Sequence, residues 1–402
     1  MIYFDHAATT PADPAVVDVM LPYFTEKFGN PSSIYEVGRD ARAAVWDARE
    51  QAAEMLGADS PMEIIFTSGA TESNNLAIKG VCEAGTHAIG GVPHAITSSI
   101  EHHCVLDSVK YLEKAFGMEA TYLPVDQGGL VNPASIKKAI RANTVLVSVM
   151  MGNNEVGTLE PIAEIGKIIA EVKAKRLKEG SKVPLVFHTD AVQAFQYFDV
   201  DVDKLGVDML SLTAHKFYGP KGVGLLYVRR GTKFMPQQQG GAQERGLRAG
   251  TENVPYIVGM VKAMELAKED QAKKEKQVAE LSDYLIARIN KEIPEVELLG
   301  PHDLPKRLPH IASFLFKRVE GESILINLDL AGIAASSGSA CTSGSLEASH
   351  VTRAMGYTDL EAHGAVRFSL GVHNTKEEID KLVDVLPKTI KKLRAMSPIK
   401  KG

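Results

Sequence analysis

The segment from residue 212 to residue 224 places a lysine where it could do covalent chemistry. Lys216 follows the apolar run Asp208–Leu212, which predicts a buried strand, and three glycines and a proline come soon after it. Lysine is rarely buried unless a protein uses it, and an amine held out of water loses proton affinity and becomes a nucleophile able to form a Schiff base. Lys216 is therefore a candidate anchor for a cofactor. A surface strand–turn–strand with a solvated lysine is the alternative.

A cofactor anchored in this way needs a cradle for an anion, and α/β folds place ligands at the carboxyl ends of strands. Residues 66–75 predict a strand, a turn of small residues and the start of a helix. Free N–H groups and the positive end of the helix dipole favour an anion there, and the hydroxyls of Ser68 and Thr71 could add donors. An ordinary helix start capped by Thr71 or Ser73 is the alternative.

A ring nitrogen in such a cofactor needs a partner as well. Asp190 comes soon after the apolar run Leu185–His188, and its carboxylate would keep a pyridine nitrogen protonated. Gln193, three residues on, could donate a hydrogen bond to a phenolic oxygen of the cofactor. The alternative for Asp190 is a helix N-cap.

Two further predicted strands are followed by polar side chains. His102, His103 and Cys104 are adjacent, but they lack the familiar zinc spacings and a second cluster, so we expect no metal site. His102 could stack on a flat ring and act as an acid/base, or it could be a structural histidine. Asn154, after a fourth strand, suits either a polar contact with a small ligand or a plain turn.

The C-terminal part of the chain adds a thiol and a guanidinium. Cys341 has glycines three residues to each side and small residues around it, a composition typical of an exposed loop. Because cysteine is usually buried, one in a loop indicates a reactive thiol, with an incidental loop cysteine as the alternative. Arg367, in the strand-like run 366–369, could clamp a substrate carboxylate with two parallel hydrogen bonds, or it could be a surface arginine.

The elements that would position these residues alternate between strands and helices over the first two-thirds of the chain, which predicts an α/β domain with a mostly parallel sheet. The predicted strands and helices are Glu63–Thr67, His94–Thr97, Thr144–Met150 and Leu185–His188, and Arg39–Leu56 and Ile162–Lys178. A long amphipathic helical pattern then covers Val258–Ile293, with Glu269–Lys273 and Asp270–Lys274 as pairs at i, i+4. Strand patterns at Ile311–Phe316 and Ala365–Leu370 follow it among helices. We therefore predict a large domain over 16–257 and a small α+β domain made of 1–15 and 258–402.

Composition restricts the setting in which the protein works. The 402 residues carry a formal net charge of −5 without a block of like charges, so we expect neither nucleic acid nor an anionic membrane as partner. No apolar run reaches the roughly 18 residues that span a bilayer, and the first residues do not resemble a signal peptide. The 3 cysteines do not form a disulfide framework. We expect a cytoplasmic protein.

Together and in this order, these pieces resemble the pyridoxal-phosphate cysteine desulfurases of the NifS/IscS type, and the match runs nearly end to end. Its motifs are Tyr3–Pro11, Phe28–Ser33, Phe66–Asn75, Asn153–Gly157, Thr189–Gln193, His215–Gly224, Arg248–Thr251, Ser336–Ser343 and Val366–Gly371. The resemblance implies fold type I of the pyridoxal-phosphate enzymes, with a large domain around a mostly parallel sheet and a smaller α+β domain. It also implies a homodimer.

The resemblance implies a role for each site residue. Lys216 matches the Schiff-base lysine, His102 the stacking acid/base and Asp190 the partner of the pyridinium nitrogen. Cys341 matches the nucleophile that accepts sulfur, and Arg367 the clamp on the substrate carboxylate. The positions that match other cofactor contacts are Ala70, Thr71, Asn154, Gln193, Thr213 and His215, with Thr251 supplied by the neighbouring subunit. Asn154 and Asn30 match substrate contacts.

The implied reaction converts L-cysteine to L-alanine. The Cys341 thiolate attacks the substrate sulfur, and the resulting persulfide delivers sulfur to a scaffold for iron–sulfur cluster assembly or to another acceptor. A selenocysteine lyase or an aminotransferase of the same fold is the first alternative, although transamination needs no loop thiol. A sulfur-relay module without chemistry is the second, and Lys216, Asp190 and His102 argue against it because a module does not need them.

Overall fold

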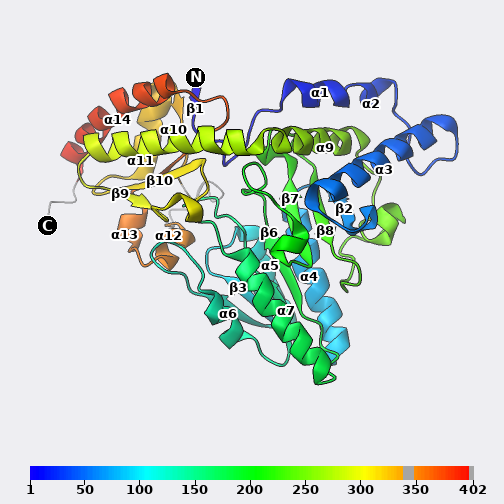
Figure 1. Ribbon diagram of the computed structural model, residues 1–402. Helices are drawn as coiled ribbons and strands as arrows, with labels where there is room; N and C mark the ends of the chain where they lie inside the picture. The colour runs from blue at the N-terminus through cyan, green and yellow to red at the C-terminus, as the bar shows by residue number, and fades with distance from the viewer. Residues whose placement is uncertain (338–347, 398–402) are drawn as a thin grey trace.

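The structure is a computed structural model that describes residues 1–337 and 348–397 (Figure 1). Its centre is a seven-stranded sheet with the strand order β2–β8–β7–β6–β5–β3–β4. The bounds are β2 (Ile64–Thr67), β3 (His94–Ser98), β4 (Glu119–Leu123), β5 (Thr144–Ser148), β6 (Val186–Asp190), β7 (Met209–Thr213) and β8 (Gly224–Val228). β8 runs antiparallel to β2 and β7, and the other neighbours pair in parallel. The predicted α/β fold with a mostly parallel sheet is confirmed.

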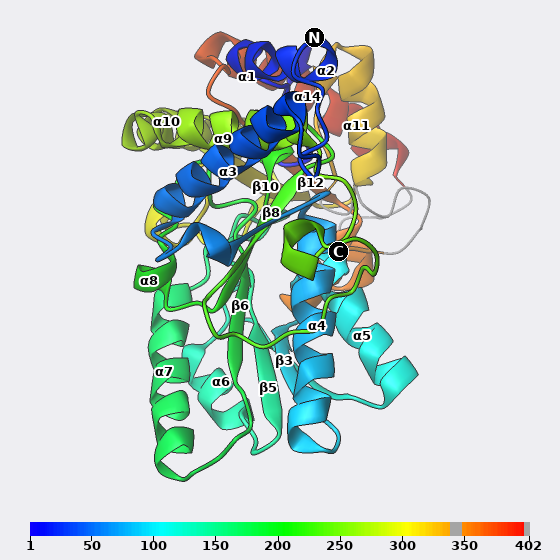
Figure 2. The same cartoon turned by 90° about the vertical axis from the view of Figure 1, so that its right-hand side faces the viewer.

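Helices cover both faces of this sheet, which explains why its strands are apolar runs instead of alternating ones. α4 (Ala70–Ile89) and α5 (His103–Phe116) lie on one face, and α6 (Pro133–Ala139) and α7 (Ile162–Lys178) lie on the other (Figure 2). All residues of β3, β5, β6, β7 and β8 are buried. No helix in the described part of the chain is long and apolar enough to cross a membrane.

The predicted elements differ from the observed ones mainly at their ends. α7 has the predicted bounds, whereas α3 (Glu36–Leu56) begins three residues before the predicted start at Arg39. β5 ends at Ser148 instead of Met150, although Val149 and Met151 still donate backbone hydrogen bonds to the chain of β6. The short strands β4 and β8 were not among the predicted elements.

The C-terminal part forms a second core around a smaller sheet. β12 (Ala365–Ser369), β10 (Ile311–Phe316) and β9 (Val296–Leu299) pair antiparallel in that order. Their apolar side chains share a core with α10 (Gln271–Glu292), α11 (Gly321–Leu330) and α14 (Lys376–Met396). The N-terminal strand β1 (Ile2–Tyr3) pairs in parallel with β11 (Ile333–Ala334), so the first residues of the chain join this C-terminal core.

The amphipathic pattern over Val258–Ile293 is two helices and not one continuous helix. α9 (Val254–Lys268) and α10 lie nearly end to end across the upper part of Figure 1, below α1 and α14. Asp270 between them has a φ of +50°, which no helical residue adopts. Lys274 donates to the main-chain carbonyls of Leu266 and Glu269 at the end of α9 instead of pairing with Asp270. The expected Asp270–Lys274 pair is therefore wrong, because the ammonium caps a helix C-terminus.

The break between α9 and α10 also separates the two hydrophobic cores. α9 contributes Met260 and Met264 to the core of the seven-stranded sheet, together with residues of α1 (Pro14–Met20) and α3. α10 contributes Val278 and Leu285 to the C-terminal core. We propose that the domain boundary lies at the break between α9 and α10, about a dozen residues after the predicted boundary at 257/258.

Candidate active site

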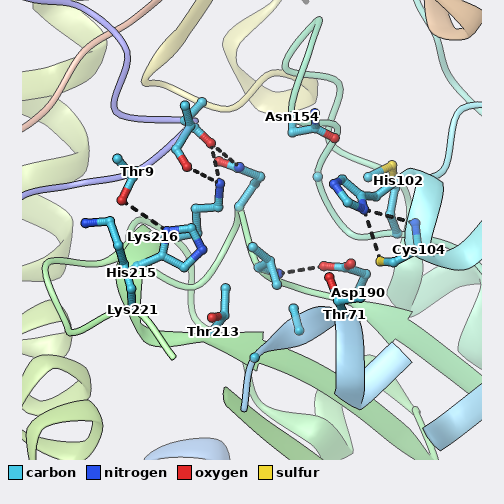
Figure 3. Close-up of a pocket in the computed structure, with 18 of the residues that line it drawn as sticks. Thr9, Thr71, His102, Cys104, Asn154, Asp190, Thr213, His215, Lys216 and Lys221 are labelled. Carbon is cyan, nitrogen blue, oxygen red and sulfur yellow. Dashed lines mark hydrogen bonds between the residues drawn. The ribbon is translucent and has the colours of Figure 1, made fainter. Parts of the chain in front are cut away.

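A cavity of about 670 Å³ opens where β6 and β7 end and where α4 and α5 begin (Figure 3). Carboxyl ends of parallel strands meet at one edge of the sheet, so residues distant in sequence come together there. The predicted site residues that line the cavity are Ser68, Ala70, Thr71, His102, Asn154, Asp190, Gln193, Thr213, His215, Lys216 and Arg367. The structure therefore brings eleven of the predicted positions into one site.

Lys216 lies in the 3-10 turn Ala214–Lys216 directly after β7. It is half-buried, and its ammonium donates to the main-chain oxygens of Ala7 at 2.7 Å and Ala8 at 2.6 Å. The alternative of a solvated surface lysine is wrong, because the N-terminal segment folds over the side chain. Tyr218, with a φ of +63°, turns the chain back towards β8.

Asp190 ends β6 and is 6% exposed. One carboxylate oxygen accepts a hydrogen bond from Asn74 Nδ2 at 2.7 Å, and the other accepts one from the backbone N–H of Val192 at 3.0 Å. A buried carboxylate that has donors on both oxygens is held in one orientation in the cavity. Such a group can serve as a fixed negative charge for a cationic ring nitrogen.

His102 is the N-cap of α5, and its ring Nδ1 accepts the backbone N–H of Cys104 at 3.2 Å. The same nitrogen lies 3.0 Å from Cys104 Sγ (Figure 3). Burial lowers the pKa of His102, and the nearby Asp190 opposes this shift only in part. A neutral imidazole whose Nδ1 accepts hydrogen bonds carries its proton on Nε2. His102 can therefore offer an N–H donor inside the cavity.

The adjacent His103 and Cys104 do not join His102 in a metal cluster. The His103 ring instead packs against His350, with 4.6 Å between the ring centroids. Burial raises the pKa of the Cys104 thiol to about 12, so this cysteine stays protonated. Within residues 1–337 and 348–397, no group of three His, Cys, Asp or Glu side chains is placed to hold a metal ion.

The start of α4 has the open helix end that the predicted anion cradle requires. Its N-cap is Gly69, and no side chain in the described part of the chain caps this helix end. Ser73 instead donates to the oxygen of Leu225, and the exposed Thr71 lines the cavity. The helix N-terminus is therefore open to an anion from the cavity. β8 passes so close that a Cβ on Gly224 would lie 2.6 Å from Gly69.

Further polar groups surround this cradle. Thr213 ends β7 and lines the cavity beside the helix start. His215 Nδ1 lies 3.1 Å from Thr9 Oγ1, and Lys221 lines the same side (Figure 3). Burial, together with the positive charges of Lys216 and Lys221, lowers the pKa of His215 to about 4. His215 is therefore a neutral group there, and the lysines supply positive charge.

Arg367 lies on β12 and is 2% exposed, so the alternative of a surface arginine is wrong. Its guanidinium donates to the main-chain oxygen of Asn154 at 2.6 Å and to the Asp5 carboxylate at 2.8 Å. Among the described residues, its Nε has no hydrogen-bond partner. The Arg367 guanidinium therefore lines the cavity with two of its nitrogens bound to Asn154 and Asp5.

Two of the described predicted residues lie outside this cavity. Asn30 is exposed, and its side-chain oxygen accepts a hydrogen bond from the backbone of Ser32 at 2.9 Å. Thr251 is exposed outside the cavity. Cys341 lies outside the described residues.

Both described ends of the segment that carries Cys341 are attached beside the cavity. Before it, Ser336 exchanges backbone hydrogen bonds of 3.2 Å and 2.7 Å with Arg367. After it, Ser349 donates to Glu155 at 2.5 Å and His350 Nε2 lies 2.9 Å from the main-chain oxygen of Glu101, the neighbour of His102. The described residues on either side of the Cys341 segment are therefore hydrogen-bonded at two sides of the site.

Several residues without a predicted role also shape the cavity. Asn74 lies three residues after Thr71 on α4, and this helical spacing could have indicated it. Ala7 and Ala8 act through main-chain oxygens, which leave no signal in the side-chain pattern. Glu72 and Lys221 were also without a role.

Known proteins are similar to this chain in both sequence and fold. Cysteine desulfurase IscS of Dictyoglomus turgidum is 52% identical over 400 residues, which cover 99% of this chain and 97% of that protein. A solved structure titled NifS-like protein has a TM-score of 0.87 and 37% identity, and the match covers 98% of this chain and 100% of that one. A structure titled SspA in complex with cysteine has a TM-score of 0.79 and 36% identity, covering 93% and 100%.

The family assignment follows from the length of the match as well as from the site. The sequence model described as aminotransferase class-V matches residues 2–382, which include every described element of the cavity. The chain belongs to the class-V aminotransferase family.

Proposed function

We propose that this chain is a pyridoxal-phosphate-dependent cysteine desulfurase, which takes sulfur from L-cysteine and releases L-alanine. The observation that carries the proposal is the meeting of Lys216, Asp190 and His102 in one cavity. Relatives named cysteine desulfurase and a similar structure solved with cysteine support the choice of reaction and substrate.

The residues present fit pyridoxal phosphate. The open N-terminus of α4, with Thr71 and Thr213, suits the phosphate group. The doubly hydrogen-bonded Asp190 suits a protonated ring nitrogen, and Lys216 suits the aldehyde carbon. When bound, this cofactor draws electrons away from the α-carbon of an amino-acid substrate. The cavity volume of about 670 Å³ is within the usual range for such sites.

The side chains of this cavity then have separate tasks. Lys216, whose ammonium donates hydrogen bonds to two main-chain oxygens, takes and returns a proton at its Nζ. His102 presents its Nε2 proton as a hydrogen-bond donor and acid. Arg367 binds the substrate carboxylate and orients the amino acid, while Asp5 keeps the guanidinium in place.

Cys341 supplies the second nucleophile. Its thiolate attacks the sulfur of the bound cysteine, and a sulfur–sulfur bond forms as the carbon–sulfur bond breaks. The electron pair of the broken bond stays with the carbon fragment, which is protonated and leaves as L-alanine. The anchors at Ser336 and His350, on two sides of the cavity, support this role because they bring both ends of the segment to the site.

We further propose a homodimer. Thr251 is exposed on its own protomer, next to a surface hollow that is lined by Trp46 and Glu252. The segment that precedes α3 exposes large apolar side chains, including Phe24 at 52% and Ile34 at 85% exposure. We propose that a second copy covers these side chains, and the resemblance implies that Thr251 then reaches the partner's cavity. The persulfide would pass to an iron–sulfur scaffold or another sulfur acceptor in the cytoplasm.

Turnover with L-cysteine and a reductant tests the proposal. The full-length protein should release alanine and sulfide in equal amounts, and Lys216→Ala should release neither. Alanine formed from pyruvate and an amino donor, without sulfide, would instead indicate an aminotransferase. Selenide released from selenocysteine, with no reaction of L-cysteine, would indicate a selenocysteine lyase.

A further inference from the structure

An ion pair lies at the edge of the anion cradle. Arg248 donates from Nε to Glu72 Oε1 at 2.7 Å and from Nη2 to Glu72 Oε2 at 3.2 Å. The two side chains are 19% and 22% exposed. Glu72 is in the first turn of α4 and lines the cavity, whereas Arg248 comes from a segment 176 positions later in the sequence.

The Glu72 carboxylate has two opposite effects on the cradle. Its Oε2 accepts hydrogen bonds from Ser68 N at 2.8 Å and Ser68 Oγ at 2.5 Å, which fixes the turn before Gly69. However, a carboxylate in the first turn is also a negative charge beside the place where a phosphate would bind. Burial by itself raises the pKa of Glu72, but the hydrogen bonds from Arg248 and Ser68 outweigh it and hold the pKa below its usual range. The charge is therefore present whenever the site works.

Hydrogen bonds of the neighbouring residues hold the segment that carries Arg248. Gln238 Nε2 donates to the oxygen of Ala249 at 2.8 Å, and Gly250 N donates to Gln243 Oε1 at 3.1 Å. Gly250 has a φ of +106°, a conformation that favours glycine. The segment therefore presents the guanidinium to Glu72 in a fixed position, with both carboxylate oxygens engaged.

We infer that Arg248 is a positioning residue for the cofactor phosphate: it cancels the charge of Glu72 at the cradle and lets that carboxylate hold the Ser68–Gly69 turn without repelling the phosphate. The inference depends on the proposed function, because it requires a phosphate at the start of α4. It gives a role to two residues that take no part in the chemistry described above.

Two ligands that differ only in the phosphate test the inference. Pyridoxine 5′-phosphate and pyridoxine lack the aldehyde, so neither bonds covalently to Lys216. Their affinities are measured by equilibrium dialysis on the full-length chain freed of cofactor. The variants are Arg248→Gln, Glu72→Gln and the double variant. Arg288→Gln is the matched control, because Arg288 donates to Glu292 at 2.7 Å with 26% and 33% exposure, outside the cavity. Thermal unfolding shows whether each variant is folded.

Arg248→Gln should bind pyridoxine 5′-phosphate about tenfold or more weakly, as expected for an uncompensated like charge near a partly buried site. Its affinity for pyridoxine should stay within about twofold, and Arg288→Gln should change neither ligand. Glu72→Gln should bind the phosphate ester at least as tightly as the parent. The double variant should regain most of the loss, because both charges are gone.

Several results would overturn the inference. Parent-like binding of the phosphate ester by Arg248→Gln would do so, as would equal weakening of both ligands or a double variant no better than the single one. If the parent chain binds pyridoxine 5′-phosphate no better than pyridoxine, the proposed phosphate site itself is wrong. That result would contradict the proposed function itself, whatever Arg248 does.

Discussion

Moving the buried carboxylate from residue 190 to residue 74 should separate its contribution to stability from its contribution to turnover. Asn74 is fully buried, and its amide donates to Asp190 Oδ2 at 2.7 Å and to Cys104 Sγ at 3.1 Å. Asn74→Ala removes the side-chain donor to the Asp190 carboxylate, and Asn74→Asp places a second carboxylate beside the first. The exchange variant, which combines Asn74→Asp with Asp190→Asn, keeps one acid and one amide but swaps their positions.

The expected sizes follow from the burial of this pair. Loss of one hydrogen bond to a buried charge costs about 2 kcal/mol, so Asn74→Ala should lower the free energy of unfolding by that amount. Asn74→Asp should cost about 3 kcal/mol or more at pH 8, because two buried carboxylates repel each other. The repulsion raises the pKa of the pair in the folded state, so this loss should shrink as the pH falls and the pair takes up a proton.

Urea unfolding at pH 5 and pH 8 measures the stability, and absorption of the bound cofactor with sulfide release measures the function. The exchange variant should recover at least half of the stability that Asn74→Asp loses. It should nevertheless turn over L-cysteine at least about a hundredfold more slowly than the parent, because residue 190 no longer carries the charge that serves a ring nitrogen.

Full turnover by the exchange variant would refute this reasoning, because the position of the carboxylate would then not matter. Equal stability of Asn74→Asp and the parent at pH 8 would refute the electrostatic part. Asn74→Leu, which removes the amide at similar volume, is the control for packing.

Three further predictions concern other parts of the molecule. Cys341→Ala should keep the cofactor and lose at least about 99% of sulfide release with L-cysteine, and full turnover would exclude its role as sulfur acceptor. Asp270→Gly should raise the free energy of unfolding by about 0.5 to 1 kcal/mol in urea, because residue 270 has a φ of +50°; an unchanged or lower value would contradict the account of the break between α9 and α10. Burial raises the pKa of Glu160 to about 8 from 4.5, so the folded state keeps a proton that the unfolded state loses, and stability falls as the pH rises through this window. Glu160→Gln should therefore gain stability relative to the parent from pH 5 to pH 8, and a constant difference would show that Glu160 does not titrate there.

Local patterns were sufficient for the elements whose faces differ clearly in polarity. α7 and β10 have the predicted bounds, because α7 has an amphipathic stripe and β10 is an apolar run interrupted only by Ser313. The pattern could not show the break at Asp270, since both helices keep an apolar face. Their faces point into different cores, and only the packing of α9 and α10 shows this.

The sequence by itself determined which side chains follow the strands of the large sheet, and hence that Lys216, Asp190, His102 and Thr71 would meet at one edge. Only the tertiary structure decided what holds them there. The main-chain oxygens of Ala7 and Ala8 bind Lys216, Asp5 pairs with Arg367, and Arg248 pairs with Glu72. These contacts join residues 176 to 362 positions apart. The strand pattern and the side-chain type are local properties of the chain, whereas such pairings depend on how the two cores pack around the cavity.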